Sequence, residues 1–211
     1  MNVVIVGGHG KIGLRLEKLL AERGDSPRGI IRKTEQAADL EQIGAEPIVL
    51  DIENVDDISD ALAGSDAVVF AAGAGPGSGP GRKRTVDYGG AVKLVDGALA
   101  KGIRRYVQVS SISSNRPESW SEQMRPYQEA KSEADKVLRE SGLDYTIIRP
   151  GGLTDDPGTG KVEVGELAYG RVTRDDVAAV IAECLVADET IGKEFDLLNG
   201  ETRIPEALGS L

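Results

Sequence analysis

The sequence is poor in the residues that equip several classes of protein. Its 211 residues include a single cysteine, Cys184, and a single histidine, His9. They exclude an internal disulfide and any Cys/His cluster with the spacing of a zinc module. No apolar run approaches the roughly 18 residues that a membrane-spanning helix needs. The first residues, MNVVIVGG, lack the basic start of a signal peptide. We therefore expect a cytoplasmic protein with no metal site and no membrane partner.

Basic residues are also in short supply. Acidic residues outnumber them 35 to 25, which gives a net charge of −10. Because such a surface repels nucleic-acid phosphates, we expect no nucleic-acid partner and attribute the acidity to solubility. The length favours one large domain over two small ones.

Short apolar runs alternate with longer amphipathic segments over the first 150 residues. The runs predict strands at 3–6, 29–31, 47–50, 67–71, 106–109 and 145–148. The segments between them predict helices at about 12–24, 34–43 (with Thr34 as N-cap), 55–62, 85–100 and 127–141. This alternation is typical of an α/β fold with a Rossmann-type, doubly wound parallel sheet in three αβα layers.

The remaining residues predict a strand at 161–164, a helix at 175–186 that Thr173 caps, and a strand near 195–198. No linker rich in Pro, Gly or Ser separates them from the rest. We therefore expect a single domain over 1–211, with a core at 1–150 and a small extension at 151–211.

A glycine-rich turn joins the first predicted strand to the first helix. Gly7, Gly10 and Gly13 recur at every third position. Glycine permits a tight turn and close approach of the backbone to a pyrophosphate, and the helix N-terminus stabilises the anion. We predict that this turn binds dinucleotide phosphates through Gly7, His9, Gly10, Lys11, Ile12 and Gly13. The alternative for His9 is a solvent-facing turn residue.

The end of the second strand indicates which dinucleotide binds. A site for NAD typically places an acidic residue there to accept from the ribose 2′-hydroxyl. This sequence has Arg32 and Lys33 instead. A carboxylate would repel a 2′-phosphate, whereas a guanidinium can bind it through two hydrogen bonds. We predict that NADP(H) is favoured over NAD(H), with Arg32 as the first contact and Lys33 as the second; the alternative is a solvated basic pair.

The segment 73–81, GAGPGSGPG, follows the fourth predicted strand. Loops beyond the carboxyl ends of the strands line the ligand crevice in doubly wound sheets. We interpret it as a mobile loop beside the cofactor, with a plain surface loop as the alternative.

Five motifs in order resemble the short-chain dehydrogenase/reductase (SDR) superfamily, particularly its small atypical branch with NmrA-like, biliverdin-reductase-B-like and epimerase/dehydratase-like members. They are the opening glycines, Ala71-Ala72-Gly73, Val109-Ser110-Ser111, Tyr127-x-x-x-Lys131 and Arg149-Pro150-Gly151. The resemblance covers nearly the whole chain. The glycine spacing differs from the G-x-G-x-x-G of many dinucleotide-dependent dehydrogenases.

The resemblance implies further cofactor contacts. Asp51 would bond the adenine amino group, with a turn cap as the alternative role for this side chain. The other implied contacts are Ile52, Ala71, Ala72, Gly73, Ser110 and Lys131, and a stretch passing under the nicotinamide, Pro150, Gly151, Gly152 and Leu153. Residues 1–150 would then bind the cofactor, and residues 151–211 would lie on the substrate side.

The resemblance also implies a catalytic group. Tyr127 and Lys131 are four residues apart, so they share one face of a helix. In SDR enzymes the tyrosine is the general acid–base, and the lysine makes the phenol more acidic and bonds the nicotinamide ribose. Ser111 matches the third catalytic position, and Ser113 and Ser114 are alternatives, as is a purely structural role for these serines in a turn.

The implied function is an NADP(H)-dependent oxidoreductase that acts on a small carbonyl or alcohol substrate, as a monomer or homodimer. One alternative is a non-catalytic NADP(H) redox sensor of the NmrA-like type. Another is a sugar epimerase or dehydratase, for which the short extension leaves little material to bind a sugar nucleotide.

Overall fold

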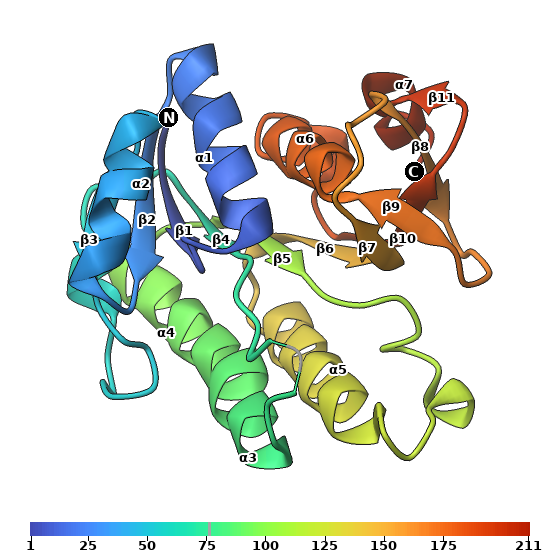
Figure 1. The fold of residues 1–211 in the computed structure, drawn as a ribbon, viewed down its shortest axis with the longest axis horizontal. Helices are drawn as coiled ribbons and strands as arrows, with labels where there is room; N and C mark the ends of the chain where they lie inside the picture. Colours follow the sequence, from blue (N-terminus) through green and yellow to red (C-terminus); the bar gives the residue numbers. More distant parts are fainter. Residues whose placement is uncertain (76) are drawn as a thin grey trace.

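The computed structural model describes residues 1–75 and 77–211. Seven parallel strands form most of one sheet: β1 (Asn2–Val6), β2 (Ser26–Ile31), β3 (Glu46–Val49), β4 (Ala67–Phe70), β5 (Arg105–Val109), β6 (Asp144–Pro150) and β10 (Lys193–Asn199). Two strands extend it in antiparallel pairing, β8 (Lys161–Gly165) and β11 (Thr202–Arg203). The order is β11-β8-β10-β6-β5-β4-β1-β2-β3 (Figure 1). The predicted Rossmann-type α/β fold is confirmed.

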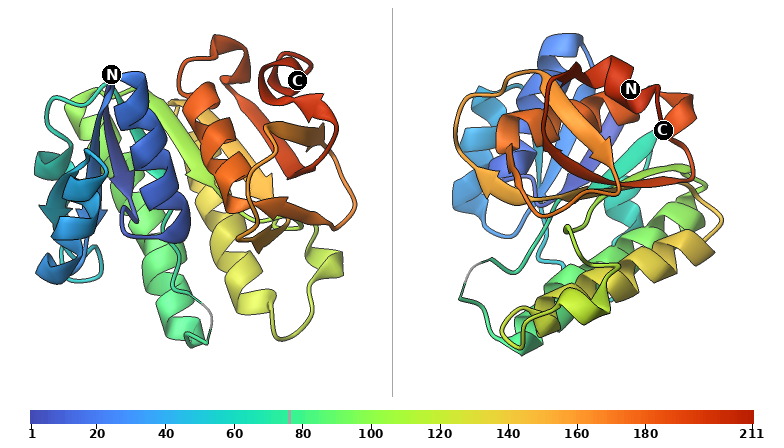
Figure 2. Two further views of the ribbon diagram at one scale, coloured as in Figure 1. Left: turned by 45° about the horizontal axis from the view of Figure 1, so that its top comes forward. Right: turned by 90° about the vertical axis from the view of Figure 1, so that its right-hand side faces the viewer.

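Helices cover both faces of this sheet. On one face lie α1 (Lys11–Arg23), α2 (Ala37–Gln42), α6 (Arg174–Cys184) and the short α7 (Ile204–Leu208). On the other lie α4 (Ala91–Lys101) and α5 (Arg125–Glu140), which run side by side (Figure 2). Because both faces are covered, the central strands are continuous apolar runs such as Val3–Val6, whose four side chains are all buried.

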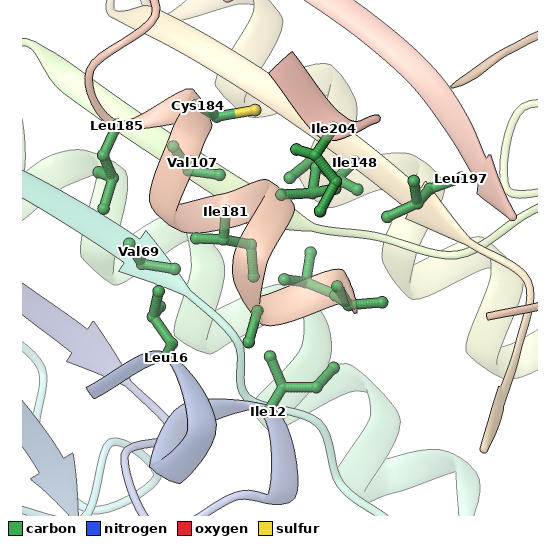
Figure 3. Close-up of a cluster of buried hydrophobic side chains, with 14 of the residues drawn as sticks. Ile12, Leu16, Val69, Val107, Ile148, Ile181, Cys184, Leu185, Leu197 and Ile204 are labelled. Atoms are coloured by element: carbon green, nitrogen blue, oxygen red, sulfur yellow. The ribbon is translucent and has the colours of Figure 1, made fainter. Parts of the chain in front are cut away.

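The core between the sheet and the first face holds α1 and α6 together. In Figure 3, Ile12 and Leu16 of α1 belong to the same cluster of buried side chains as Ile181 of α6 and as Val69 and Val107 of the sheet. The start of α6 is fixed as predicted, since the Thr173 hydroxyl accepts a 2.9 Å hydrogen bond from the Asp176 N–H. Arg15 of α1 lies 2.5 Å from Asp175 in the first turn of α6, so the two helices are also joined by an ion pair at this end.

Two local predictions were wrong. The predicted helix at 55–62 is only a 3₁₀ turn, Ser59–Leu62, because the Asp57 carboxylate accepts the Ser59 N–H and hydroxyl and ends the helical pattern upstream. Thr34 is not an N-cap: a 3₁₀ turn, Thr34–Gln36, precedes α2, and Lys33 stands at the cap position. There the Gln36 side chain accepts the Lys33 N–H.

The predicted helix at 85–100 begins earlier than expected. It starts as α3 (Pro80–Arg82), continues as a π-helical segment, η3 (Lys83–Gly90), and becomes α4. Part of the glycine-rich segment 73–81 is therefore helical. Residue 76, which belongs to the segment predicted to be a mobile loop, lies outside the described residues.

Short elements in the extension were not predicted. β7 (Gly152–Thr154) and β9 (Arg171–Thr173) pair in parallel as a separate two-stranded sheet. The main sheet ends on one side at β3, which contains Pro47, and on the other at the two-residue β11. None of the helices described has the length and apolar character needed to cross a bilayer.

Candidate active site

Two cavities lie along the carboxyl ends of the parallel strands. The sequence order reverses direction between β1 and β4, and a ligand crevice is expected at such a point. The first cavity, of about 350 Å³, is lined by the turn after β1 and by the ends of β2, β3 and β4. We call it the β1–β4 cavity. The second, of about 540 Å³, is lined by the segments that follow β5 and β6 and by the start of α5. We call it the β5–β6 cavity.

The backbone of the glycine turn packs too closely against its neighbours to admit side chains at Gly7 and Gly13. Gly7 has a positive φ of 91°, and a Cβ there would lie 2.8 Å from the Ala72 Cα. A Cβ on Gly13 would lie 2.3 Å from the Gly7 carbonyl oxygen. Gly10 lines the β1–β4 cavity directly. α1 has no side-chain cap and no acidic residue in its first turn, so its free N–H groups fit an anionic phosphate.

The other residues of the turn contribute differently. The Ile12 side chain is buried in the core, and Lys11 Nζ is 2.5 Å from Asp155 Oδ2, so near the cavity these residues offer backbone N–H groups. The half-buried His9 ring forms hydrogen bonds with the Asp39 carboxylate at 2.7 Å and with the Gln36 side-chain amide at 3.0 Å. Gln36 lines the same cavity and was not predicted.

Two arginines line the β1–β4 cavity. Arg32 is exposed and lines it, whereas Lys33 is exposed but does not. Arg82 of α3 also lines it and was not predicted. Arg82 Nη2 lies 2.6 Å from Glu53 Oε2, and this hydrogen bond lowers the pKa of the Glu53 carboxyl. Together, Arg32 and Arg82 offer two guanidinium groups to an anion in this cavity.

Asp51 forms a turn at the end of β3. Its carboxylate accepts the Glu53 N–H and the Asn54 side-chain amide, each at 3.0 Å. These bonds match the alternative role of a turn cap, and Asp51 lines the cavity as well. The other predicted contacts in this cavity are Ile52, Ala71, Ala72 and Gly73.

Lys131 of α5 is almost fully buried. Its Nζ donates to the Val109 carbonyl at 3.1 Å and to the Ala72 carbonyl at 3.4 Å. It also lies 3.4 Å from Oδ1 of the fully buried Asp87 in η3. Ala72 lines the β1–β4 cavity, so the ammonium group contacts the wall of that cavity. Asp87 was not predicted.

Tyr127 lines the β5–β6 cavity, one helical turn before Lys131. Two cations flank its ring: Lys131 Nζ lies 5.9 Å from the ring centroid and Lys83 Nζ lies 5.0 Å from it. The structure therefore brings the predicted pair together and adds Lys83. Pro150, Gly151, Gly152 and Leu153 line this second cavity rather than the first.

The candidate serines separate into two groups. Ser111 and Ser113 line the β5–β6 cavity. The Ser111 hydroxyl accepts from Gln128 Nε2 and donates to the Ile112 carbonyl, each at 3.3 Å. The Ser110 and Ser114 hydroxyls instead turn away, toward Asp135 at 2.8 and 3.1 Å. Of the three candidates for the catalytic hydroxyl, Ser114 is thus held in the interior.

Asp135 is the centre of a buried polar network below this cavity. Besides the two serines, it accepts from Gln108 Nε2 at 2.7 Å and lies 3.4 Å from Arg149 Nε. Burial raises the pKa of the Asp135 carboxyl. Arg149 in turn pairs with Glu194 of β10. The network ties the segment after β5 to β6 and β10, so it fixes the walls of the β5–β6 cavity.

Known proteins resemble this chain over its whole length. A family model described as NAD(P)H-binding matches residues 7–188. A Bacillus subtilis protein named "uncharacterized sugar epimerase YhfK" is 42% identical, and the match covers all of both chains. A solved structure named as a putative NAD-dependent epimerase/dehydratase from Bacillus halodurans is 41% identical, covers all of both chains and has a TM-score of 0.95.

A third relative has a named activity. ChuY from Escherichia coli O157:H7, described as an anaerobillin reductase, is 26% identical with a TM-score of 0.80. The match covers 96% of this chain and 99% of that one. The resemblance to the small atypical SDR group is thus confirmed, and the chain belongs to the NAD(P)H-binding family.

Proposed function

We propose that this protein is an NADP(H)-dependent oxidoreductase that reduces a small carbonyl compound with Tyr127 as its acid–base group. The observation that carries the proposal is the position of Lys131. This buried cation is bonded to two backbone carbonyls and lies 3.4 Å from Asp87; it contacts Ala72 of the β1–β4 cavity and lies 5.9 Å from the ring centroid of Tyr127, which lines the β5–β6 cavity. A dinucleotide is the kind of ligand long enough to use both cavities.

The residues present fit that cofactor. The glycine turn, where Gly7 and Gly10 line the cavity, and the first N–H groups of α1 would hold its pyrophosphate. Arg32 and Arg82 would hold a 2′-phosphate, and Lys131 would hold the nicotinamide ribose. When bound, NADP(H) supplies the hydride.

The side chains of the β5–β6 cavity would handle the proton. Tyr127 can donate it from its phenol oxygen to the substrate oxygen and take it back in the reverse reaction. The charges of Lys131 and Lys83 favour negative charge on that oxygen while the proton moves. Ser111 Oγ, held by Gln128, can orient the substrate oxygen. The Asp135 network keeps the serine segment in place.

A second candidate function follows from a relative. The 42% identical protein is named as a sugar epimerase. An epimerase would use the same cofactor site but would leave the amount of reduced cofactor unchanged over a full cycle. Net oxidation of NADPH therefore separates the two functions.

The test is steady-state NADPH oxidation with a panel of small aldehydes, ketones and quinones, beside direct titration of NADPH. We expect turnover by the wild type and a fall of roughly 10²–10⁴-fold in Tyr127→Phe, the usual contribution of a positioned acid–base group. NADPH affinity should change little, because the ring stays and only the hydroxyl is removed.

Two outcomes would contradict the proposal. Turnover that survives Tyr127→Phe intact would remove Tyr127 from proton transfer. Tight NADPH binding without turnover on any substrate would favour a redox sensor, or an epimerase if a sugar nucleotide is interconverted.

A further inference from the structure

The mouth of the β5–β6 cavity is apolar and open to solvent. Met124, Leu153 and Tyr169 line the cavity, and 44%, 37% and 75% of their respective surfaces are exposed. Trp120 and Ile112 line it further in. A soluble protein rarely gathers exposed apolar side chains at one place unless something binds there. Aromatic side chains at such a site favour a flat, conjugated ligand.

One charged residue faces this apolar surface. Among the described residues that line the cavity, Arg174 alone carries a charge. It is the first residue of α6, where the helix dipole disfavours a cation, whereas the next two residues, Asp175 and Asp176, carry the charge that the dipole favours. Helix stability therefore does not account for an arginine at this position.

The cluster of ion pairs around Arg174 contains more cations than carboxylates. Arg174 Nη1 lies 2.9 Å from Asp155 Oδ1. Asp155 also pairs with Lys11 at 2.5 Å and with Arg15 at 3.6 Å. Arg15 pairs further with Asp175 at 2.5 Å. Three cations thus share two carboxylates, and of the three only Arg174 lines the β5–β6 cavity.

We infer that the β5–β6 cavity binds a flat aromatic carbonyl substrate that carries a carboxylate or a similar anion, and that Arg174 binds this anion. The inference deepens the proposed function by naming the class of its substrate. The aromatic part would lie among Trp120, Tyr169 and Leu153, with the carbonyl directed to Tyr127 and the anion to the guanidinium at the start of α6.

The test uses the single tryptophan of the chain as its reporter. Trp120 lines the cavity, and its indole N–H is bonded to the Ser113 carbonyl at 2.6 Å, so its fluorescence reports occupancy without any turnover. The probes are 4-nitrobenzoate and 4-nitrobenzamide, which share one shape and differ in charge. They are titrated into the protein alone and into the protein saturated with NADP⁺.

We expect the carboxylate to bind about tenfold more tightly than the amide, the lower end of the range for a hydrogen bond to a charged group. In Arg174→Gln this ratio should fall to about 1 while amide binding is unchanged. Arg15→Gln is the matched control, since it removes a cation from the same ion-pair cluster outside the cavity and should keep the ratio.

Three results would overturn the inference: no preference for the carboxylate in the wild type, a preference that survives Arg174→Gln, or equal losses in Arg174→Gln and Arg15→Gln. If Arg174→Gln weakened NADP⁺ alone, the arginine would serve the cofactor instead. Failure of the proposed oxidoreductase is seen separately, as absent NADPH oxidation, and would leave these binding ratios in place.

Discussion

The two cavities are built in different ways. The β1–β4 cavity is formed largely by backbone at strand ends, with glycines where a Cβ would collide with a neighbouring strand. The β5–β6 cavity is formed largely by side chains from segments far apart in the chain, such as Trp120, Tyr127, Leu153 and Arg174. A cofactor common to many enzymes can be held by backbone geometry, whereas a particular substrate needs particular side chains.

Lys131→Met should have the largest effect, because the proposed function gives Lys131 a role in binding the cofactor and a role in proton transfer. We expect turnover to fall by roughly 10³–10⁴-fold or more and NADPH affinity to fall with it. The free energy of unfolding should also drop by about 3–5 kcal/mol, since Asp87 is left as an unpaired buried charge. Activity, NADPH titration and urea unfolding measure the three effects. Tyr127→Phe is the control, and equal NADPH affinities in the two variants would remove Lys131 from the cofactor site.

Glu17→Gln tests whether a buried carboxyl group of α1 makes the stability of the protein depend on pH. Glu17 of α1 is fully buried, its carboxylate oxygens have no partner among the described residues, and Oε1 occupies the space left by Gly8 and Gly29. Burial raises its pKa from 4.5 to about 8. The folded protein therefore binds a proton that the unfolded chain has released above pH 4.5.

The raised pKa of Glu17 makes the free energy of unfolding depend on pH. The contribution of Glu17 to the free energy of unfolding is fully present below pH 4.5 and is lost as the pH rises through about 8. The isosteric Gln cannot ionise, so Glu17→Gln should match the wild type near pH 4.5. Between pH 4.5 and about 8 it should gain about 1.4 kcal/mol of relative stability per pH unit, or about 3 kcal/mol at pH 7. Unfolding in urea at several pH values measures this difference, and a constant difference would refute it.

Arg32→Asp tests which dinucleotide the first cavity prefers. The wild type should bind NADPH more tightly than NADH by about 10–100-fold, the worth of a charge-assisted contact to the 2′-phosphate. The variant should lose this preference, and Lys33→Asp, outside the cavity, should retain most of it. Equal affinities for the two cofactors in the wild type would refute the assignment of Arg32.

We expect the smallest effects from substitutions of Ser111 and Ser114, two serines of one segment with different surroundings. Ser111→Ala should lower turnover by about 10–100-fold and change stability little, because its hydroxyl lies in the β5–β6 cavity. Ser114→Ala should do the opposite and cost about 1–2 kcal/mol of stability, because Asp135 and Arg149 each lose one buried hydrogen bond. The reverse pattern would make Ser114 the catalytic hydroxyl.

The same contrast explains what the sequence could predict. A local sequence pattern was enough to find the glycine turn, Arg32 and the Tyr127–Lys131 pair. Each depends only on spacing within one strand–turn–helix unit or one helical turn. Asp87 is 44 residues from its partner Lys131 and reaches it through a π-helical segment, whose register no helical periodicity indicates.

Other features depended on distant parts of the chain. Glu17 is a charged residue in an amphipathic helix, and such a residue normally faces solvent. Its burial follows from the glycines on the neighbouring turn and strand, Gly8 and Gly29. β7 and β9 have three residues each, too few for any periodicity, and they form only because residues 152–154 meet residues 171–173.

The outer strands bear on how copies of this protein can meet. An unpaired edge of a sheet can add a strand from another molecule, which leads to open-ended association. β3 presents Pro47, which has no N–H to donate, and β11 has only two residues, one of them Arg203. β11 covers only residues 161 and 162 of β8, so the edge that remains on this side is the short stretch 163–165. Neither edge offers a long template for a tenth strand. A dimer of this protein would therefore form through its helices or loops, and its two sheets would not join into one across the interface.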